Sequence, residues 1–163
     1  MLSSGNRVLA GCRDPEKAES LRALQMEFEQ LEILRLSVDQ EDSVLSCFDQ
    51  LASENRKIDL LFNNAGIIDW SDLREVSLNS LEEVYRTNLI GALLVLRASL
   101  PCLGKSSDPL VVNLSSRLGS ISLRGNTQLG GALAYQCSKA ALNMLTKQGA
   151  IDLEPQGIRV ISL

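Results

Sequence analysis

The chain has 163 residues, of which 45% are hydrophobic and 22% charged, the balance of a single globular domain rather than of a disordered segment. Its net charge of −4, with both signs mixed along the chain, argues against a nucleic-acid-binding surface, which needs a basic patch. The absence of histidine excludes Ser-His-Asp and Cys-His catalysis within this chain, together with most transition-metal sites.

Short apolar runs alternate with amphipathic segments along the chain. After the first apolar run, Asp14 is a candidate N-cap and Pro15 a candidate first residue of a helix. The run 58–63 is almost entirely apolar, which predicts a strand covered on both faces. The predicted strands are 7–11, 31–38, 58–63, 110–114 and 158–163. The predicted helices include 44–51, 80–100 and 132–154. Pro101 is expected to end the long helix from Ser80 to Leu100, and the last helix is expected to stop near Pro155 and Gly157.

This alternation of strands and helices with short connections predicts right-handed crossovers. The fold class is therefore α/β, with a doubly wound parallel sheet in a single domain over 1–163. No apolar run reaches the roughly 20 residues that span a bilayer, and the N-terminus lacks the apolar region of a secretory signal. We therefore expect a cytoplasmic protein without a membrane partner. Because ligands of such sheets bind outside the carboxyl ends of the strands, the residues after each strand are the candidate site.

Polar or small residues follow three of the predicted strands. Arg13 follows the first predicted strand. At this position of a dinucleotide site an acidic residue binds the ribose 2′-hydroxyl, whereas an arginine suits a 2′-phosphate. Considered by itself, such an arginine is more often a surface charge. The motif NNAG (63–66) lets a ligand approach the backbone closely, but a plain Asn-rich turn has the same composition. The motif NLSSRLG (113–119) places two hydroxyls after a buried strand, and serines are also common in loops.

Tyr135 and Lys139 lie four residues apart in the last predicted helix, so their side chains are about 40° apart on one helix face. A lysine ammonium beside a phenol favours the ionised phenol, which would make the tyrosine an acid or base of use near neutral pH. An exposed Tyr/Lys pair without a function has the same spacing. However, all these candidates converge on one crevice, and that convergence favours a catalytic site.

In their order, NNAG, RTN with Asn88, VNLSS followed by RLG, and YQCSK resemble the motifs of the short-chain dehydrogenase/reductase superfamily. The resemblance runs from Arg7 to Leu163. A looser similarity in SSRLGSI and AALNMLTK points to the C-signal and sniffer-like carbonyl reductase branch. The resemblance implies a Rossmann-like fold and hydride transfer between NADP(H) and a small-molecule carbonyl or alcohol substrate.

The resemblance also implies a role for each candidate residue. Tyr135 would be the general acid or base, and Lys139 would assist it and hold the nicotinamide ribose. Ser116 would hydrogen-bond the substrate oxygen, and Asn88 would brace a proton-relay water near Lys139. Arg13, with no acid before it, resembles the NADP-preferring pattern, with NAD as the alternative. The other cofactor-binding candidates are Val38, Asn63, Asn64, Ala65 and Gly66.

The chain departs from the family pattern in several places. Ser37 stands where an Asp often lies near the adenine, and the interval from Ser116 to Tyr135 is longer than is common. The strand and TGxxxGxG loop that open the family fold have no counterpart here, and neither has its last strand. The first of these strands would lie between the first and third strands of this chain, so two unpaired edges should face a gap. We therefore expect the 163-residue chain to be marginally stable and to bind NADPH poorly.

Two other functions are compatible with the same motifs. A truncated and catalytically inactive fragment or isoform would act, if at all, by binding a partner protein. A sugar-nucleotide epimerase shares the Tyr/Lys pair, but such chains are usually much longer and carry a larger substrate domain. The resemblance further implies association into homo-oligomers through the helices over 80–100 and 132–154. The charge balance, by contrast, is the reason to expect no nucleic-acid partner.

Overall fold

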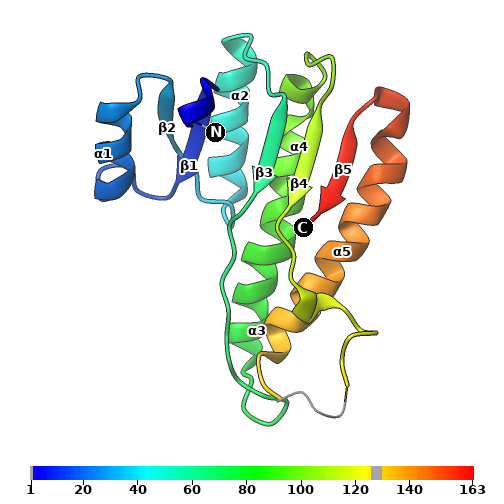
Figure 1. The fold of residues 1–163 in the computed structure, drawn as a ribbon. Coiled ribbons are helices and arrows are strands. Elements are labelled where there is room, and N and C mark those ends of the chain that lie inside the picture. Colours follow the sequence, from blue (N-terminus) through cyan, green and yellow to red (C-terminus); the bar gives the residue numbers. More distant parts are fainter. Residues whose placement is uncertain (1, 126–129) are drawn as a thin grey trace.

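The computed structural model describes residues 2–125 and 130–163, and Figure 1 shows its strands running from top to bottom, with their carboxyl ends below. The strands are β1 (Val8–Cys12), β2 (Leu31–Arg35), β3 (Leu60–Asn63), β4 (Leu110–Asn113) and β5 (Arg159–Ser162). Parallel pairing joins them into two sheets, of order β1-β2 and β3-β4-β5. The predicted α/β class is confirmed. No pairing among the described residues joins β1 to β3, as expected of two edges that face a gap.

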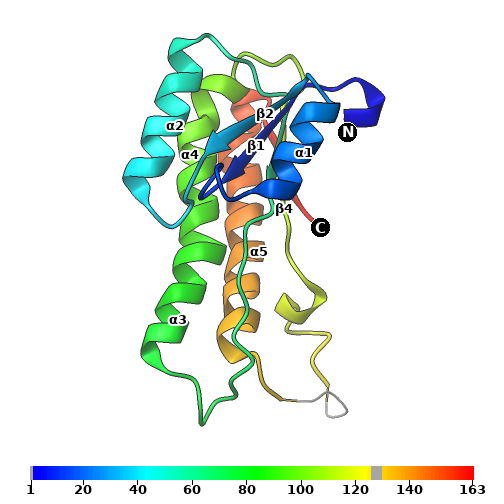
Figure 2. The ribbon, with the colours of Figure 1, turned by 90° about the vertical axis from the view of Figure 1, so that its left-hand side faces the viewer.

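A helix follows each strand from β1 to β4, and helices lie on both sides of the first sheet (Figure 2). The helices are α1 (Glu19–Glu27), α2 (Glu41–Ser53), α3 (Leu78–Tyr85), α4 (Gly91–Leu103) and α5 (Leu133–Leu153), with 3-10 turns at Leu2–Ser4, Arg117–Gly119 and Glu154–Gln156. A π-helical turn, Arg86–Ile90, joins α3 to α4. Figure 2 shows α1 on the opposite side of β1 and β2 from α2 and α4. Both α3 and the π-helical turn pack against α5, so the residues they carry reach the start of that long helix.

Two predicted helix ends are wrong. Asp14 and Pro15 do not begin α1, which starts at Glu19, because the Asp14 carboxylate closes a separate turn through an ion pair with Lys17 at 2.9 Å. Pro101 does not end its helix and lies inside α4, two residues before the last one. A proline removes one backbone hydrogen bond, and this close to the helix end few further bonds depend on it.

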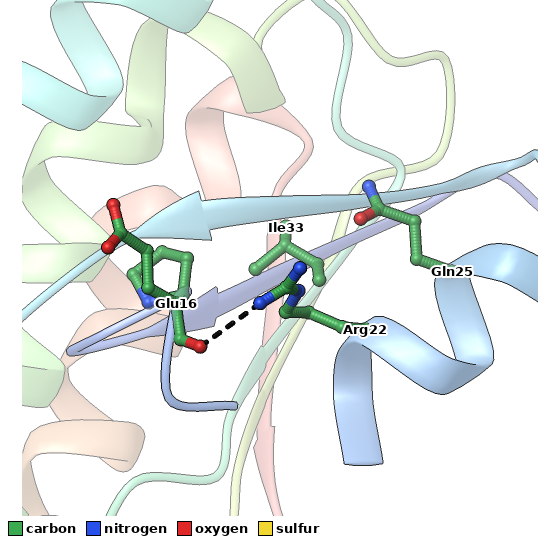
Figure 3. Close-up of a pocket in the computed structure, with 5 residues that line it drawn as sticks. Glu16, Arg22, Gln25 and Ile33 are labelled. Atoms are coloured by element: carbon green, nitrogen blue, oxygen red, sulfur yellow. Dashed lines mark hydrogen bonds between the residues drawn. The ribbon is translucent and has the colours of Figure 1, made fainter. Parts of the chain in front are cut away.

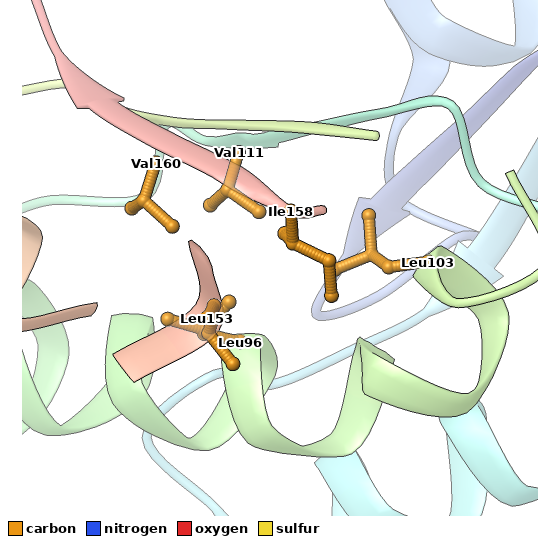
Figure 4. Close-up of a cluster of buried hydrophobic side chains, with 6 residues drawn as sticks. All are labelled: Leu96, Leu103, Val111, Leu153, Ile158 and Val160. Carbon is orange, nitrogen blue, oxygen red and sulfur yellow. The ribbon is translucent and has the colours of Figure 1, made fainter. Parts of the chain in front are cut away.

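The main core lies between the β3-β4-β5 sheet and the helices α4 and α5. The strand register aligns Leu61, Val111 and Val160 on one face of this sheet. Val111 is fully buried, and burying an aliphatic side chain of this size contributes roughly 1.5–3 kcal/mol to stability. Figure 4 shows the cluster of buried residues that this face joins: Leu96, Leu103, Val111, Leu153, Ile158 and Val160.

The segment Leu78–Leu103, which comprises α3, the π-helical turn and α4, is long and apolar enough to cross a membrane by length and composition alone. This finding differs from the prediction, made from the sequence, that no apolar run is long enough to span a bilayer. Its second half packs against α2 and the sheet, and Leu96 and Leu103 belong to the core. The apolar composition of this segment is therefore accounted for by helix packing.

The opposite face of the β3-β4-β5 sheet carries exposed apolar side chains. Leu60, Phe62 and Ile161 are 37%, 43% and 42% exposed, although they alternate along their strands with the core residues. The prediction that the run 58–63 would be covered on both faces is therefore wrong for the described residues. An apolar run shows that a strand can be buried, whereas the cover has to come from elsewhere in the structure.

We predict that the 163-residue chain, expressed by itself, melts at low temperature, associates readily, and gains little stability from NADPH. The unpaired edges of β1 and β3 and the exposed apolar face both favour association with other chains. Far-UV circular dichroism suits the melt better than fluorescence, since Trp70 is already 72% exposed in the folded chain.

A matched pair of variants separates the exposed face from the core. Phe62→Ser should reduce light scattering without lowering the melting temperature, whereas Val111→Ser should unfold the chain. A cooperative melt of the unmodified chain that NADPH raises by several degrees would contradict this prediction.

Candidate active site

Helix α5 carries Tyr135 in its first turn and Lys139 one turn later. The Lys139 Nζ lies 5.6 Å from the centroid of the Tyr135 ring, so the two side chains share one helix face. Lys139 is only 4% exposed, and its ammonium donates a hydrogen bond to the Leu114 carbonyl oxygen at 2.6 Å. Burial lowers the pKa of Lys139 below its ordinary value, because removal from water disfavours the charged form. A buried cation thus lies directly beside a phenol.

The residues that follow β4 bring two hydroxyl groups to the same helix. Ser115 Oγ donates a hydrogen bond to Asn143 Oδ1 at 2.6 Å. Ser116 begins the 3-10 turn Arg117–Gly119, and its Oγ accepts a hydrogen bond from the Leu118 N–H at 3.1 Å. The Ser116 oxygen therefore acts as an acceptor in this turn, and its O–H remains able to donate to a ligand.

Asn88 lies in the π-helical turn and is 1% exposed. Its Oδ1 accepts from the Ile67 N–H at 2.8 Å, and its Nδ2 donates to the Ile67 carbonyl at 2.9 Å and to Ser138 Oγ at 3.0 Å. A side chain on Gly66 would place its Cβ 3.4 Å from Asn88 Oδ1 and 3.6 Å from Lys139 Nζ. Asn88 thus fixes the segment after NNAG above the lysine.

A pair of side-chain amides, Asn63 and Asn113, links the strand ends to α5. Asn63 Nδ2, at the end of β3, donates to Asn113 Oδ1 at 2.8 Å. Asn113 Nδ2 donates in turn to Thr146 Oγ1 at 2.9 Å, and Asn113 is 1% exposed. Sequence reasoning missed Asn113, Thr146 and Asn143 as members of the site. The signal was present, since Tyr135, Lys139, Asn143 and Thr146 form a polar stripe at helical spacing, and Asn113 interrupts an apolar strand.

The loop after NNAG also caps the start of α5. The carbonyl groups of Trp70 and Ser71 accept hydrogen bonds, both of 3.1 Å, from the N–H groups of Ala132 and Leu133. Helix N-termini leave such N–H groups without partners, and Ala132 has no capping side chain of its own. Asp69 holds this loop by accepting from the Ser71 hydroxyl and N–H, and these bonds lower the pKa of the Asp69 carboxyl. This loop thus fixes the helix end that bears Tyr135.

These segments enclose a cavity of about 250 Å³, which we take as the candidate active site. Its lining residues come from the loops after β3 and β4 and from α5: Asn64, Gly66, Ile67, Ile68, Leu114, Ser115, Tyr135 and Lys139. A larger and more open hollow of about 600 Å³ lies between α1 and β2 (Figure 3). There Arg22 Nη1 donates to the Glu16 carbonyl at 3.2 Å, and the lining residues Pro15, Glu16, Arg22, Gln25 and Ile33 include neither a tyrosine nor a lysine.

The structure separates some of the predicted site residues from this cavity. Arg13 is exposed after β1, in the other sheet, and its carbonyl accepts from Arg35 Nη1 at 3.4 Å. Val38 packs against Gly91 of α4, where an added Cβ would lie 3.0 Å from Val38 Cγ2. Four of the predicted residues line the cavity: Asn64, Gly66, Tyr135 and Lys139. Four others adjoin these lining residues but are not part of the lining: Asn63, Ala65, Asn88 and Ser116.

The chain resembles proteins of one family along its whole length. A profile described as short chain dehydrogenase matches residues 1–163. The chain is 38% identical over 107 residues to C-signal of Myxococcus xanthus, a match that covers 65% of this chain and 63% of that protein. It is 32% identical over 130 residues to cyclopentanol dehydrogenase of Comamonas testosteroni, covering 80% of this chain and 50% of the relative.

Solved structures show the same likeness. NADPH-bound carbonyl reductase from chicken fatty liver aligns with a TM-score of 0.90 at 36% identity, over 95% of this chain and 66% of that one. Carbonyl reductase Sniffer of D. melanogaster aligns with a TM-score of 0.85 at 31% identity, over 94% of this chain and 66% of that one. The chain therefore spans about half to two thirds of the length of these relatives.

Proposed function

Because the chain belongs to the short-chain dehydrogenase/reductase family, we propose that it carries the acid–base apparatus of an NADP(H)-dependent oxidoreductase acting on a carbonyl or alcohol. The observation that carries this proposal is the buried Lys139 beside the Tyr135 ring, in a cavity at the carboxyl ends of β3 and β4. A cation sequestered from water next to a phenol is a costly arrangement that proton transfer would explain.

In carbonyl reduction, the Tyr135 hydroxyl gives its proton to the substrate oxygen, which becomes the alcohol. Lys139 lies close enough to the ring to stabilise the phenolate that remains, and the Leu114 carbonyl holds the ammonium in place. Ser116 donates its hydroxyl proton in a hydrogen bond to the same substrate oxygen, where negative charge develops. Asn88 braces the segment above Lys139 and supports a relay of protons from water. In alcohol oxidation the same groups act in reverse.

The residues fit the nicotinamide–ribose end of NADP(H). Lys139 is placed to hold the ribose hydroxyls, and the absence of a side chain at Gly66 leaves space beside it. NADPH, when bound, supplies the hydride. A cavity of about 250 Å³ accepts this end rather than the whole dinucleotide. Arg13 is assigned to a 2′-phosphate, with NAD as the alternative cofactor, and the resemblance assigns Val38, Asn63, Asn64 and Ala65 to the remainder of the cofactor.

The test is NADPH consumption by the purified full-length protein, meaning the 163 residues together with any segments that adjoin them in the natural chain. The substrates are a panel of aromatic and aliphatic ketones and aldehydes. We expect oxidation that depends on the carbonyl compound and runs faster with NADPH than with NADH. A blank without carbonyl is the control. Absence of turnover with every compound, at cofactor concentrations that saturate a related carbonyl reductase, would contradict the proposal. It would favour the alternative of an inactive isoform that binds a partner protein.

Two further assignments belong to the same proposal. The first is a cytoplasmic location, and the second is association into homo-oligomers through the long helices, which rests on the family resemblance. Light scattering of the purified protein tests the second. Substitution of an exposed residue of α5, Ile151, which is 52% exposed, should weaken the oligomer if that helix forms the contact.

A further inference from the structure

The turn that contains Ser116 is bound to α5 at three points. Lys139 Nζ donates to the Leu114 carbonyl at 2.6 Å, before the turn. Ser115 Oγ donates to Asn143 Oδ1 at 2.6 Å, and Asn143 Nδ2 donates to the Gly119 carbonyl at 3.4 Å, after the turn. The Asn143 side chain therefore holds the residue before Ser116 and the last residue of the turn that Ser116 begins.

The contact between this turn and the helix is close. A Cβ added to Gly119 would lie 2.7 Å from the Lys139 carbonyl carbon and 2.8 Å from Lys139 Cβ. These are backbone and near-backbone atoms that cannot move aside easily, so the turn lies directly on the helix at the lysine. A change in the position of the turn would therefore alter the spacing between Ser116 and the Tyr135–Lys139 pair.

We propose that Asn143 is a positioning residue for the reaction described above, which this inference presupposes. It fixes Ser116 relative to Tyr135 and engages the hydroxyl proton of Ser115. Ser115 lines the cavity and Ser116 only adjoins it, so a free Ser115 hydroxyl would compete for the substrate oxygen. Asparagine suits this task because one uncharged side chain both accepts and donates. Aspartate at this position keeps the acceptor for Ser115 and places a negative charge against the Gly119 carbonyl.

The experiment compares four variants of the full-length protein with the wild type. Asn143→Leu removes both hydrogen bonds, Asn143→Asp keeps one, Ser115→Ala removes the donor, and the double variant Ser115→Ala/Asn143→Leu completes a cycle. Met144→Leu, on the exposed neighbour, is the matched control. The readouts are kcat, the KM values for carbonyl and NADPH, the melting temperature, and hydrogen exchange of the peptide that covers 114–119.

We expect Asn143→Leu, which removes two hydrogen bonds to the turn, to lower kcat about tenfold with the KM for NADPH unchanged. Ser115→Ala removes only one of these two bonds and should lower kcat by a smaller factor. The double variant should match Asn143→Leu, because the bond that Ser115→Ala removes is already absent there. Asn143→Asp should fall between wild type and Asn143→Leu. Exchange of the 114–119 peptide should quicken in Asn143→Leu and stay unchanged in Met144→Leu.

An unchanged kcat in Asn143→Leu, or additive losses in the double variant, would overturn the positioning role. A loss of kcat that accompanies a large fall in melting temperature would also overturn it, if Asn143→Asp restores neither quantity. That pattern indicates a structural role only. A wild-type protein without carbonyl reduction would instead overturn the proposed function. The exchange measurement then still decides whether Asn143 holds the turn, because it needs no turnover.

Discussion

Tyr135→Phe is expected to lower kcat for carbonyl reduction by about 10²- to 10⁴-fold, the usual contribution of a positioned general acid. The substitution keeps the ring that lies 5.6 Å from Lys139 Nζ and removes only the hydroxyl. Packing at the start of α5 is therefore preserved, and the melting temperature should stay close to that of the wild type. Initial rates of NADPH oxidation at saturating substrate measure the effect on kcat.

The chain supplies its own control, because it contains only one other tyrosine. Tyr85 lies at the end of α3, and burial raises the pKa of its phenol, which makes it a poorer proton donor near neutral pH. Tyr85→Phe removes the same atom from the same residue type and should leave kcat within about twofold, as for a position without a catalytic role. Equal rates in Tyr135→Phe and the wild type would remove the enzymatic interpretation.

Lys139→Met should lower kcat by about 10²- to 10³-fold, as when a group that stabilises developing charge is removed. It should also change how stability depends on pH. Burial lowers the pKa of Lys139 in the folded chain below its ordinary value of 10.5. At pH values between the lowered pKa of the folded chain and the pKa of 10.5 in the unfolded chain, the unfolded chain binds more protons than the folded chain. This group therefore makes the folded state more stable as the pH rises through that window. The methionine variant lacks this rise.

Urea unfolding at several alkaline pH values tests the second effect. The stability of the wild type relative to Lys139→Met should increase with pH up to about 10.5 and level off above it. The substitution also leaves the Leu114 carbonyl without its donor, which lowers stability by about 1–3 kcal/mol at every pH. Lys147→Met, at an exposed position of the same helix, is the control. A constant difference between wild type and variant across the pH series would show that Lys139 titrates as an ordinary surface lysine.

The sequence allowed most of the fold to be predicted because strands and helices differ in the period of their apolar residues. Each strand was located to within a few residues, and α5 was predicted within one residue at each end. Two helix ends were predicted wrongly because proline usually ends a helix and aspartate usually begins one. In this chain the surroundings of Pro101 and Asp14 override these average preferences. The exposed face of β3 could not be foreseen either, since Phe62 has the same side chain whether or not another segment covers it.

The candidate site was predicted in part for a related reason. Tyr135 and Lys139 are adjacent on one helix, so their proximity follows from helix geometry alone. The bonds from Asn63 to Asn113 and from Ser115 to Asn143 join residues 50 and 28 positions apart. Nothing local in the sequence specifies such partners. Their discovery needed the strand order and the position of α5 across the sheet.

The π-helical turn Arg86–Ile90 has a consequence for how this protein tolerates insertions and deletions. The Gly91 N–H bonds to the Arg86 carbonyl five residues back, so the turn holds one residue more than an α-helical turn. One residue corresponds to about 100° of helix rotation. Deleting a single residue there would let the helix run on regularly, and it would turn Leu96 and Leu103 away from the core or Asn88 away from Ile67. The length of the segment 78–103 is therefore under stronger constraint than the identity of most of its exposed residues.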